Sequence, residues 1–255
     1  MTLRGRAGSS ASSLDCLSLL NHMQFIEKNS FNVRSAVYRL KKNGSPLEFL
    51  IFPMIHVGSS EFYREISNRL SSCDLILAEG VKSKRVYLLT LSYRIVKYIR
   101  RMDLVTQQDG MRIESFRAKI LNADMEGSAF DESWSSLPVL LRARLFIIIP
   151  VFVVYLFLFG TRETLARNIA LDDLPSSEEI LSEDENFEQL DSLIVDERDR
   201  KLIEHIARLE DQQIKDFQQV GIIYGARHMR TTIAFLMQKL NYRVVQAEWV
   251  KVFDL

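Results

Sequence analysis

The chain has 255 residues, of which 47% are hydrophobic and 26% charged, so it can bury a sizeable core and is not a disordered chain. Lysine plus arginine equals aspartate plus glutamate at 33 each, and this balance gives no electrostatic support for nucleic-acid binding. The two cysteines, Cys16 and Cys73, form no CxxC pair, which excludes a disulfide framework and a thiolate zinc site.

The N-terminal segment has no clear signal peptide, because the apolar run after Cys16 is too short for one. Residues 7–13 are rich in serine, glycine and alanine, which is typical of a mobile segment. We therefore predict a mobile tail over residues 1–30 and a single domain over residues 31–255. The expected location is the cytoplasm, with association with a membrane as an open alternative.

A hairpin is predicted to lead to the first candidate site residue. Residues 35–41 alternate like a half-buried strand, and Asn43-Gly44 is a strong hairpin signal because both residues tolerate positive φ. The apolar strand over residues 47–55 then carries His56 into a turn with glycine and serine, before a predicted helix that Ser59 or Ser60 caps.

Carboxylates follow two further predicted strands. Glu79 ends the apolar stretch DLILAE (74–79), and Asp124 follows FRAKILNA (116–123), with Glu126 nearby. Ligands of open α/β sheets bind beyond the carboxyl ends of strands, which favours a functional site. Helix capping or pairing with a surface arginine explains Glu79 equally well, and turn chemistry explains Asp124.

Two middle segments raise the question of a membrane. Residues 84–101 predict an amphipathic helix whose basic side is typical of a solvated face. Residues 145–159 carry no charge and contain one proline, but a bilayer span needs about twenty apolar residues. A single crossing would separate His56 and Glu79 from residues after the run, so a joint site requires a buried, interfacial or hairpin arrangement.

The next segments are an acidic stretch at 172–188, typical of an exposed loop, and a helix opened by Asp196. Arg198 lies in the first turn of that helix, where the macrodipole favours anions, so a specific partner is expected for it. His205, farther along the same helix, is typical of boundary structure, and we leave it out of the site.

The last unit predicts a strand at 220–224, Gly225, His228 at the start of a helix, and a closing strand at 242–253. Its order resembles a βαβ unit. His228 is therefore presented in the same way as His56, at the turn between an apolar strand and a helix, which suggests two halves of one site.

The candidate site thus contains His56, Glu79, Arg198 and His228, with Asp124 and Asp199 nearby. Two histidines and a carboxylate are a common set of zinc ligands, and an arginine can stabilise charge on a carbonyl oxygen. Without a metal, the same set supports acid–base chemistry in which a histidine activates water. No HExxH, GxSxG, P-loop or GxGxxG motif is present.

These motifs resemble the TraB/PrgY/Tiki superfamily, relatives of erythromycin esterase, which has two GxxH motifs, a strand-end glutamate and an ERD-like motif. The matching segments are GARH (225–228), ERD (197–199) and LILAEGV (75–81). The first GxxH motif departs, because PMIH (53–56) has Pro53 where the family has glycine. The resemblance covers roughly residues 35–253, with 128–188 the least familiar part.

The resemblance implies an α/β fold with an α+β tendency: a mixed β-sheet flanked by helices, with a helical insertion at about 128–190 that contains an apolar helix. It implies a hydrolase of peptide, amide or ester bonds that uses a divalent metal ion held by His56, Glu79 and His228, while Arg198 stabilises the oxyanion. The expected partner is a peptide or small-molecule substrate, and no nucleic acid is expected. A membrane surface is a further possible partner, through residues 145–159. The alternative is a non-catalytic, regulatory or membrane-associated binding protein of the same fold.

Overall fold

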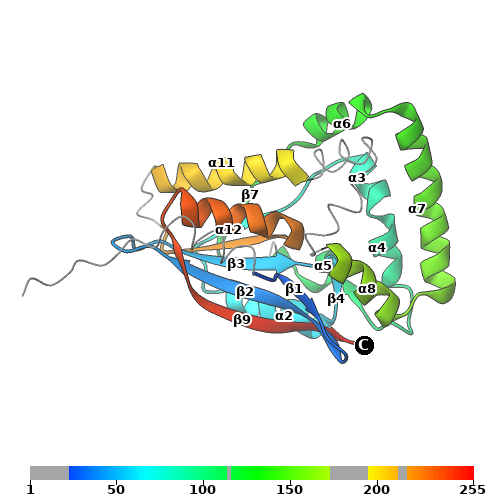
Figure 1. Cartoon of the computed structure of the whole chain (residues 1–255), viewed down its shortest axis with the longest axis horizontal. Coiled ribbons are helices and arrows are strands. Elements are labelled where there is room, and N and C mark those ends of the chain that lie inside the picture. Colours follow the sequence, from blue (N-terminus) through cyan, green and yellow to red (C-terminus); the bar gives the residue numbers. More distant parts are fainter. Residues whose placement is uncertain (1–22, 114–115, 173–194, 212–216) are drawn as a thin grey trace, which may run out of the picture.

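The computed structural model describes residues 23–113, 116–172, 195–211 and 217–255, and shows a mixed sheet with helices on both faces (Figure 1). The strands of this sheet are β1 (Ile26–Lys28), β2 (Asn32–Lys41), β3 (Glu48–Met54), β5 (Leu75–Ala78), β7 (Lys119–Asn122), β8 (Gln219–Gly225) and β9 (Arg243–Asp254). A small separate ribbon pairs β4 (Val57–Gly58) with β6 (Val105–Thr106). The predicted α/β class with a mixed sheet is confirmed.

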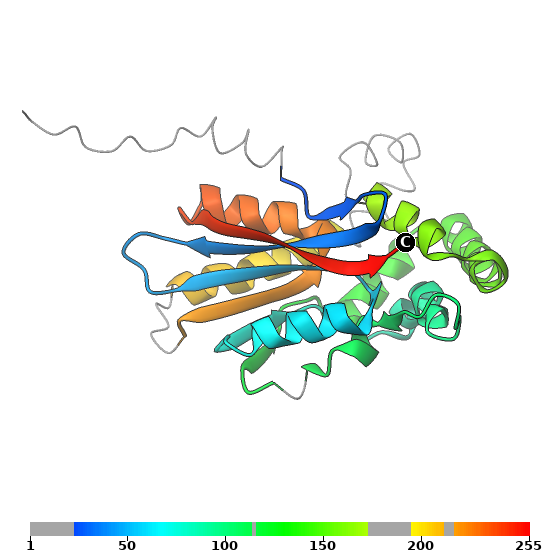
Figure 2. The same cartoon turned by 90° about the horizontal axis from the view of Figure 1, so that it is seen from below.

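The helices follow the strands in the chain and form the two outer layers. They are α2 (Ser60–Leu70), α3 (Lys84–Leu89), α4 (Leu91–Val96), α5 (Gln107–Gly110), α6 (Gly127–Ser136), α7 (Val139–Phe159), α8 (Arg162–Asp172), α11 (Glu197–Asp211), the short 3₁₀ turn η3 (Ala226–His228) and α12 (Met229–Gln238). Figure 2 shows α2 on one face of the sheet, and α11 and α12 on the other.

The sheet joins a parallel half to an antiparallel half. β3, β8, β5 and β7 run parallel in that spatial order, so β8 lies between two strands that precede it by more than 140 residues. β2 pairs antiparallel with β9 along its whole length, and on its other edge with β1 and then β3. The predicted hairpin is confirmed, with Gly44 at φ 80°.

Alternating side chains divide the core between the two faces of the sheet. On β3, Leu50 and Phe52 pack with α2, whereas Phe49 and Ile51 pack with α11 and α12. This two-residue alternation over buried strands explains why the sheet carries helices on both sides.

The N-terminal tail is shorter than the predicted 30 residues. Met23 and Phe25 are buried, Ile26–Lys28 forms β1, and the Tyr38 hydroxyl donates to the carbonyl of Gln24 over 2.5 Å. Met23 and Phe25 follow the serine-rich segment and are buried, with the Phe25 ring against Tyr38 of β2. The composition of residues 7–13 did not indicate this burial. Residues 1–22 lie outside the described part of the chain.

Two local predictions need correction. Residues 84–101 form two short helices, α3 and α4, and not one helix, since Thr90 between them leaves helical geometry at φ −88° and ψ 6°. The closing strand β9 does not neighbour β8, as in a simple βαβ unit, but pairs with β2 on the far side of β3. The acidic stretch predicted as a loop at 172–188 lies, beyond its first residue, outside the described part.

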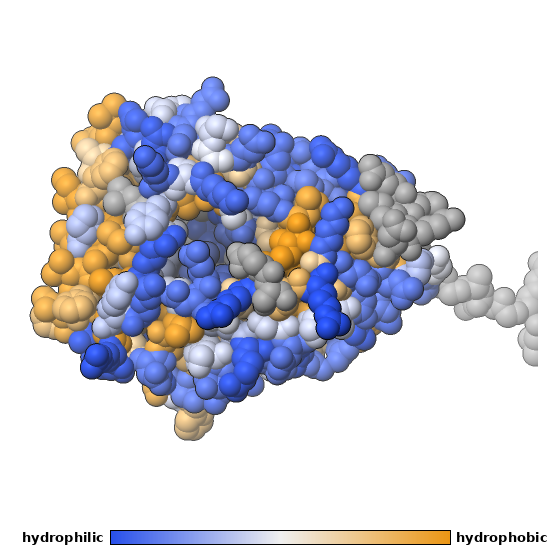
Figure 3. All heavy atoms as spheres, turned by 180° about the vertical axis from the view of Figure 1, so that it is seen from behind, coloured by the Kyte–Doolittle hydropathy of each residue, from blue (hydrophilic) through white to orange (hydrophobic). Residues whose placement is uncertain are grey.

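The apolar run belongs to α7, a 21-residue helix that is long and apolar enough to cross a membrane by length and composition. Only 11% of its most apolar 18-residue window is buried in the protein. Figure 1 shows α7 at the outer edge of the molecule, next to α4, and Figure 3 shows apolar side chains gathered along that edge from behind. A buried arrangement of residues 145–159 is therefore excluded for this fold.

Candidate functional site

The predicted site residues gather where the parallel strands end. His56 follows β3, Glu79 follows β5, Asp124 follows β7, and Gly225 ends β8. Because these four strands are parallel neighbours, their carboxyl ends meet at one edge of the sheet. The first turn of α11 adds Arg198 at that edge, and η3 adds His228.

Arg198 connects two strands by binding the carboxylates that follow them. Its Nε donates to Asp124 Oδ1 over 2.9 Å, its Nη2 donates to Asp124 Oδ2 over 2.7 Å, and Nη2 also donates to Glu79 Oε1. The side chains are largely buried, with 12% of Arg198, 14% of Glu79 and none of Asp124 exposed. The two carboxylates raise the pKa of the buried Arg198 guanidinium, against the effect of its burial. The specific partner expected for Arg198 is thus found, and Asp124 is a member of the cluster that the sequence named only as a neighbour.

Asp124 is further fixed by the backbone. Its Oδ2 accepts from the Gly80 N–H over 2.9 Å and its Oδ1 from the Met125 N–H over 2.8 Å. With the bidentate Arg198 contact, both oxygens are used, which satisfies a carboxylate that has no access to water.

Glu79 is held as an anion. Burial opposes its ionisation, but the positive charge of Arg198, with further contributions from His56 and His228, outweighs burial and lowers the pKa of Glu79 to about 2. Glu79 Oε2 also accepts from the Gly225 N–H over 2.6 Å. The glutamate therefore carries its charge at neutral pH.

His228 is paired with a carboxylate that was not placed in the predicted site. Its Nδ1 lies 2.7 Å from Asp199 Oδ1, and both side chains are buried. The Tyr224 ring meets the His228 ring edge-on, with 5.1 Å between centroids. Since an ionised carboxylate only accepts hydrogen bonds, Nδ1 carries the proton in the neutral imidazole and Nε2 keeps its lone pair. Asp199 is the third residue of the ERD motif and directly follows Arg198. This position was the feature of the sequence that could have placed Asp199 in the site.

His56 is exposed and approaches the cluster from the solvent side. Its ring packs obliquely against Tyr93 of α4, with 5.0 Å between centroids. Its positive charge is one of the causes that lower the pKa of Glu79. The structure thus brings together Glu79, Arg198 and His228 by direct contacts or through Gly225, and sets His56 beside them.

Gly225 allows the close approach of Glu79 and His228. A Cβ at this position would lie 3.3 Å from Glu79 Oε2, 3.4 Å from His228 Cδ2 and 3.9 Å from His228 Nε2. A side chain at this position would crowd the carboxylate of Glu79 and the imidazole of His228, so the glycine of GARH lets these two groups approach each other.

Pro53, which replaces the glycine of the first motif, is accommodated within β3. It lies opposite Tyr224 of β8, and its carbonyl accepts from the Ser35 hydroxyl over 2.6 Å. The pairing of β3 with β2 has already ended at Ile51, so the missing N–H of proline is not needed there.

The donor atoms do not form a complete set of metal ligands. No three His, Cys, Asp or Glu side chains in the described residues are spaced to hold one ion. Both oxygens of Glu79 already accept hydrogen bonds, from Arg198 and from Gly225. His228 Nε2 suits a metal, since Asp199 orients the other nitrogen, but its predicted partners do not complete a site. The divalent metal stays a prediction of the resemblance.

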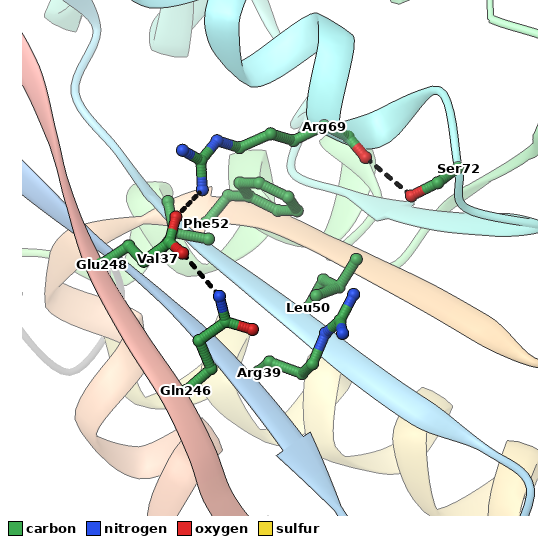
Figure 4. Close-up of a pocket in the computed structure, with 8 residues that line it drawn as sticks. All are labelled: Val37, Arg39, Leu50, Phe52, Arg69, Ser72, Gln246 and Glu248. Carbon is green, nitrogen blue, oxygen red and sulfur yellow. Dashed lines mark hydrogen bonds and ion pairs between the residues drawn. The ribbon is translucent and has the colours of Figure 1, made fainter.

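A separate cavity of about 150 Å³ lies on the opposite face of the sheet, beneath the end of α2 (Figure 4). It is lined by Val37, Arg39, Leu50, Phe52, Arg69, Ser72, Gln246 and Glu248. Arg69 and Glu248 pair across its rim over 2.6 Å. None of these residues belongs to the cluster at the strand ends, so the cavity is not part of the candidate site.

Comparisons with protein-family models, with curated proteins and with solved structures find no match for this chain.

Proposed function

We propose that the protein is a hydrolase of peptide, amide or ester bonds, of the TraB/PrgY/Tiki type, in which His228 activates water. The observation that carries the proposal is the buried pair of Asp199 and His228, joined over 2.7 Å beside the anionic Glu79. A carboxylate on Nδ1 fixes the orientation and tautomer of an imidazole, as a general base requires.

In the proposed reaction, His228 Nε2 takes a proton from water while the water oxygen attacks the carbonyl carbon. The resulting imidazolium is stabilised by Asp199 on Nδ1 and by the nearby charge of Glu79. The tetrahedral intermediate then collapses, the bond to the leaving amine or alkoxide breaks, and Nε2 returns the proton to it. No step of this route requires a group outside the chain.

The other two residues have supporting roles in the proposal. Arg198 already donates Nε and Nη2 to carboxylates, so we assign it the positioning of Glu79 and not direct contact with substrate. His56 is exposed and lies on the solvent side of Glu79, so we assign its N–H to the carbonyl oxygen on which negative charge develops.

We infer further that the protein associates with a membrane through α7, whose apolar side chains are largely exposed. Monomeric soluble proteins rarely expose contiguous apolar patches of more than a few hundred Å². This association is independent of the chemistry at His228.

The test of the hydrolase is turnover of an internally quenched peptide and of p-nitrophenyl acetate by the wild type, His228→Asn and His205→Asn. Asparagine keeps a donor for Asp199 but removes Nε2, so His228→Asn should lose at least about 10²-fold in kcat at an unchanged melting temperature. His205→Asn changes a histidine on α11 outside the cluster and should retain full turnover. Unchanged turnover in His228→Asn would refute the proposal.

Treatment with a chelator tests the predicted metal separately. The proposed route expects unchanged turnover after removal of divalent ions, whereas loss of turnover restored by one ion would favour the metal-dependent alternative.

The second candidate is a binding protein that retains the fold without turnover. The saturated contacts of Glu79, Arg198 and Asp124 favour it, because such a cluster also stabilises a scaffold. Absence of turnover by the wild type on both substrates, with a folded protein, would favour this candidate.

A further inference from the structure

We propose that α7 lies in the plane of one leaflet of an anionic membrane, with the whole domain on one side, so that the chain does not cross the bilayer. This inference rests on the membrane association proposed above and specifies its orientation and its lipid class. It follows from three features. These are the exposed surface of α7, the sheet in which strands that precede α7 pair with a strand that follows it, and the charges near α7.

The exposed surface of α7 is mainly apolar, with Arg144 as an exposed charge near its N-terminal end. Its side chains with half or more of their surface exposed are Val139, Leu140, Phe146, Ile147, Ile148, Val151, Val154, Leu158 and Phe159. At about 1.5 Å per residue the helix is about 32 Å long, so length alone permits a crossing. Length therefore does not decide between a span and an in-plane helix.

The fold excludes a single crossing. Glu79 and Asp124 precede α7 in the chain and Arg198 follows it, yet Arg198 donates to both carboxylates. β8, which also follows α7, is hydrogen-bonded between β3 and β5, which precede it. Both ends of α7 must then lie on the same side of any membrane.

Contacts along α7 hold it against the domain. Arg101, in the turn that follows α4, donates to the carbonyls of Leu156, Phe157 and Gly160 at the C-terminal end of α7. Leu141 and Leu156 are buried against the domain. Interfacial helices usually have a charged face toward water; α7 has no such face, and the domain covers it mainly at Leu141 and Leu156.

The charges near α7 favour anionic lipid. Residues 81–102, which include α3 and α4, contain seven lysines and arginines and no acidic residue, and residues 133–162 contain Arg142, Arg144 and Arg162 and no acidic residue. Some of these charges are paired, Arg85 with Asp131 and Lys97 with Asp109, whereas Lys82, Lys84 and Arg100 are exposed and form no ion pair within the described part of the chain. Exposed tyrosines accompany these charges: Arg94 lies over the ring of Tyr87, and Lys97 over that of Tyr98. Basic and aromatic residues beside an apolar surface are typical of the headgroup layer.

A second copy of the chain fits this surface less well. Pairing α7 with α7 in either direction would bring together the arginines near its ends and the basic residues 81–102 of the two copies. The helix itself has no acidic residue to offset these charges. The exposed Lys82, Lys84 and Arg100 suit anionic headgroups, which is why we assign the surface to lipid.

The first test is flotation with vesicles of phosphatidylcholine, alone or with a minor fraction of phosphatidylserine. We expect the full chain to float, at least about tenfold more with phosphatidylserine at low salt, since screening by salt weakens such attraction. Ile147→Glu combined with Val151→Glu should abolish flotation, because both side chains are about two-thirds exposed. Val245→Glu, at a half-exposed position on the distant β9, is the matched control and should float normally.

The second test is topology. In a Cys16→Ser background, Ser136→Cys and Thr161→Cys place an exposed thiol before and after α7, while Cys73 is buried. After cell-free synthesis in the presence of vesicles, a membrane-impermeant maleimide should label both positions. Protection of one end alone would show a crossing and overturn the proposal.

Two further outcomes would also overturn it. One is absence of flotation; the other is dimers in solution that Ile147→Glu dissociates, since a second copy would then cover α7. His228→Asn should float like the wild type, so failure of the hydrolase and failure of the membrane orientation are distinguishable.

Discussion

Asp199 and His228 lie 29 residues apart in the sequence, and their side chains meet over 2.7 Å in the interior of the protein. Asp199 is in the first turn of α11, and His228 is the last residue of η3, after β8. The pair ties α11 to the end of β8, and His228 Nε2 lies near Gly225, 3.9 Å from where a Cβ would stand. It is the feature of the site from which the proposed chemistry starts.

Asp199→Asn should lower kcat without unfolding the protein. An amide holds the imidazole less strictly in one tautomer and does not stabilise its charged form, so we expect a loss of about 10²- to 10⁴-fold. The pH profile of kcat should shift as well, which a purely structural role would not cause. Asp211→Asn, at the exposed end of the same helix, is the control. A normal pH profile and normal kcat in Asp199→Asn would contradict the assigned role.

Arg198→Met should destabilise the fold strongly. The substitution leaves the buried carboxylates of Glu79 and Asp124 without their guanidinium, and breaking a buried pair in this way costs about 3–5 kcal/mol. Urea unfolding of the variant measures the loss. Arg208→Met, on the exposed side of the same helix, should change stability by less than about 0.5 kcal/mol. A loss below about 1 kcal/mol in Arg198→Met would show that the cluster is not held by this arginine.

Glu79 should make the protein sensitive to acid. Its pKa is lowered to about 2 in the folded state from 4.5, so its stabilisation is complete above pH 4.5 and is lost as the pH falls toward 2. The full effect amounts to about 3 kcal/mol as an upper estimate. The free energy of unfolding of Glu79→Gln should fall less steeply than that of the wild type between pH 4.5 and 2. Glu204→Gln, half-exposed on α11, controls for removal of a charge, and equal slopes in all three proteins would refute the prediction.

Gly225→Ala should impair turnover more than stability. The backbone of Gly225, at φ −52° and ψ 144°, is accessible to alanine, but the new Cβ would crowd Glu79 Oε2 and His228 Cδ2. A shift of a few tenths of an ångström at these two groups should lower kcat by roughly tenfold, with a stability change within about 1 kcal/mol. Gly80→Ala is the matched control, because its nearest atom, Asn122 Nδ2, is 4.0 Å from the new Cβ. If both variants keep normal kcat, the space beside Nε2 is not used by the reaction.

Local patterns were sufficient for most secondary structure. The alternation of residues 35–41 and the Asn43-Gly44 pair predicted the hairpin, and the spacing of Leu202, Ile206 and Leu209 predicted the buried face of α11. These features depend on interactions within a few residues, which is why the sequence reveals them. The break at Thr90 was missed because a hydroxyl in a helical pattern can either point to solvent or bond to the preceding turn.

The pairing of distant segments was not predictable in the same way. Strand-end carboxylates and an arginine in an acidic first turn indicated a site, but not that Arg198 would bind Glu79 and Asp124 together. Nor did the sequence indicate that Asp199 would reach His228. Each of these contacts depends on the order of the strands, with the late strand β8 placed between β3 and β5.

The sequence by itself determined that His56, Glu79, Arg198 and His228 stand at strand ends and helix starts, because apolar periodicity and turn residues are local signals. Only the tertiary structure decided which of these side chains touch, that Asp199 and Asp124 complete the cluster, and that α7 lies exposed at the edge of the domain. The physical reason is that burial, ion pairing and the alignment of parallel strands depend on contacts between residues far apart in the sequence, 29 residues for Asp199 and His228 and 119 for Glu79 and Arg198, and no local pattern contains that information.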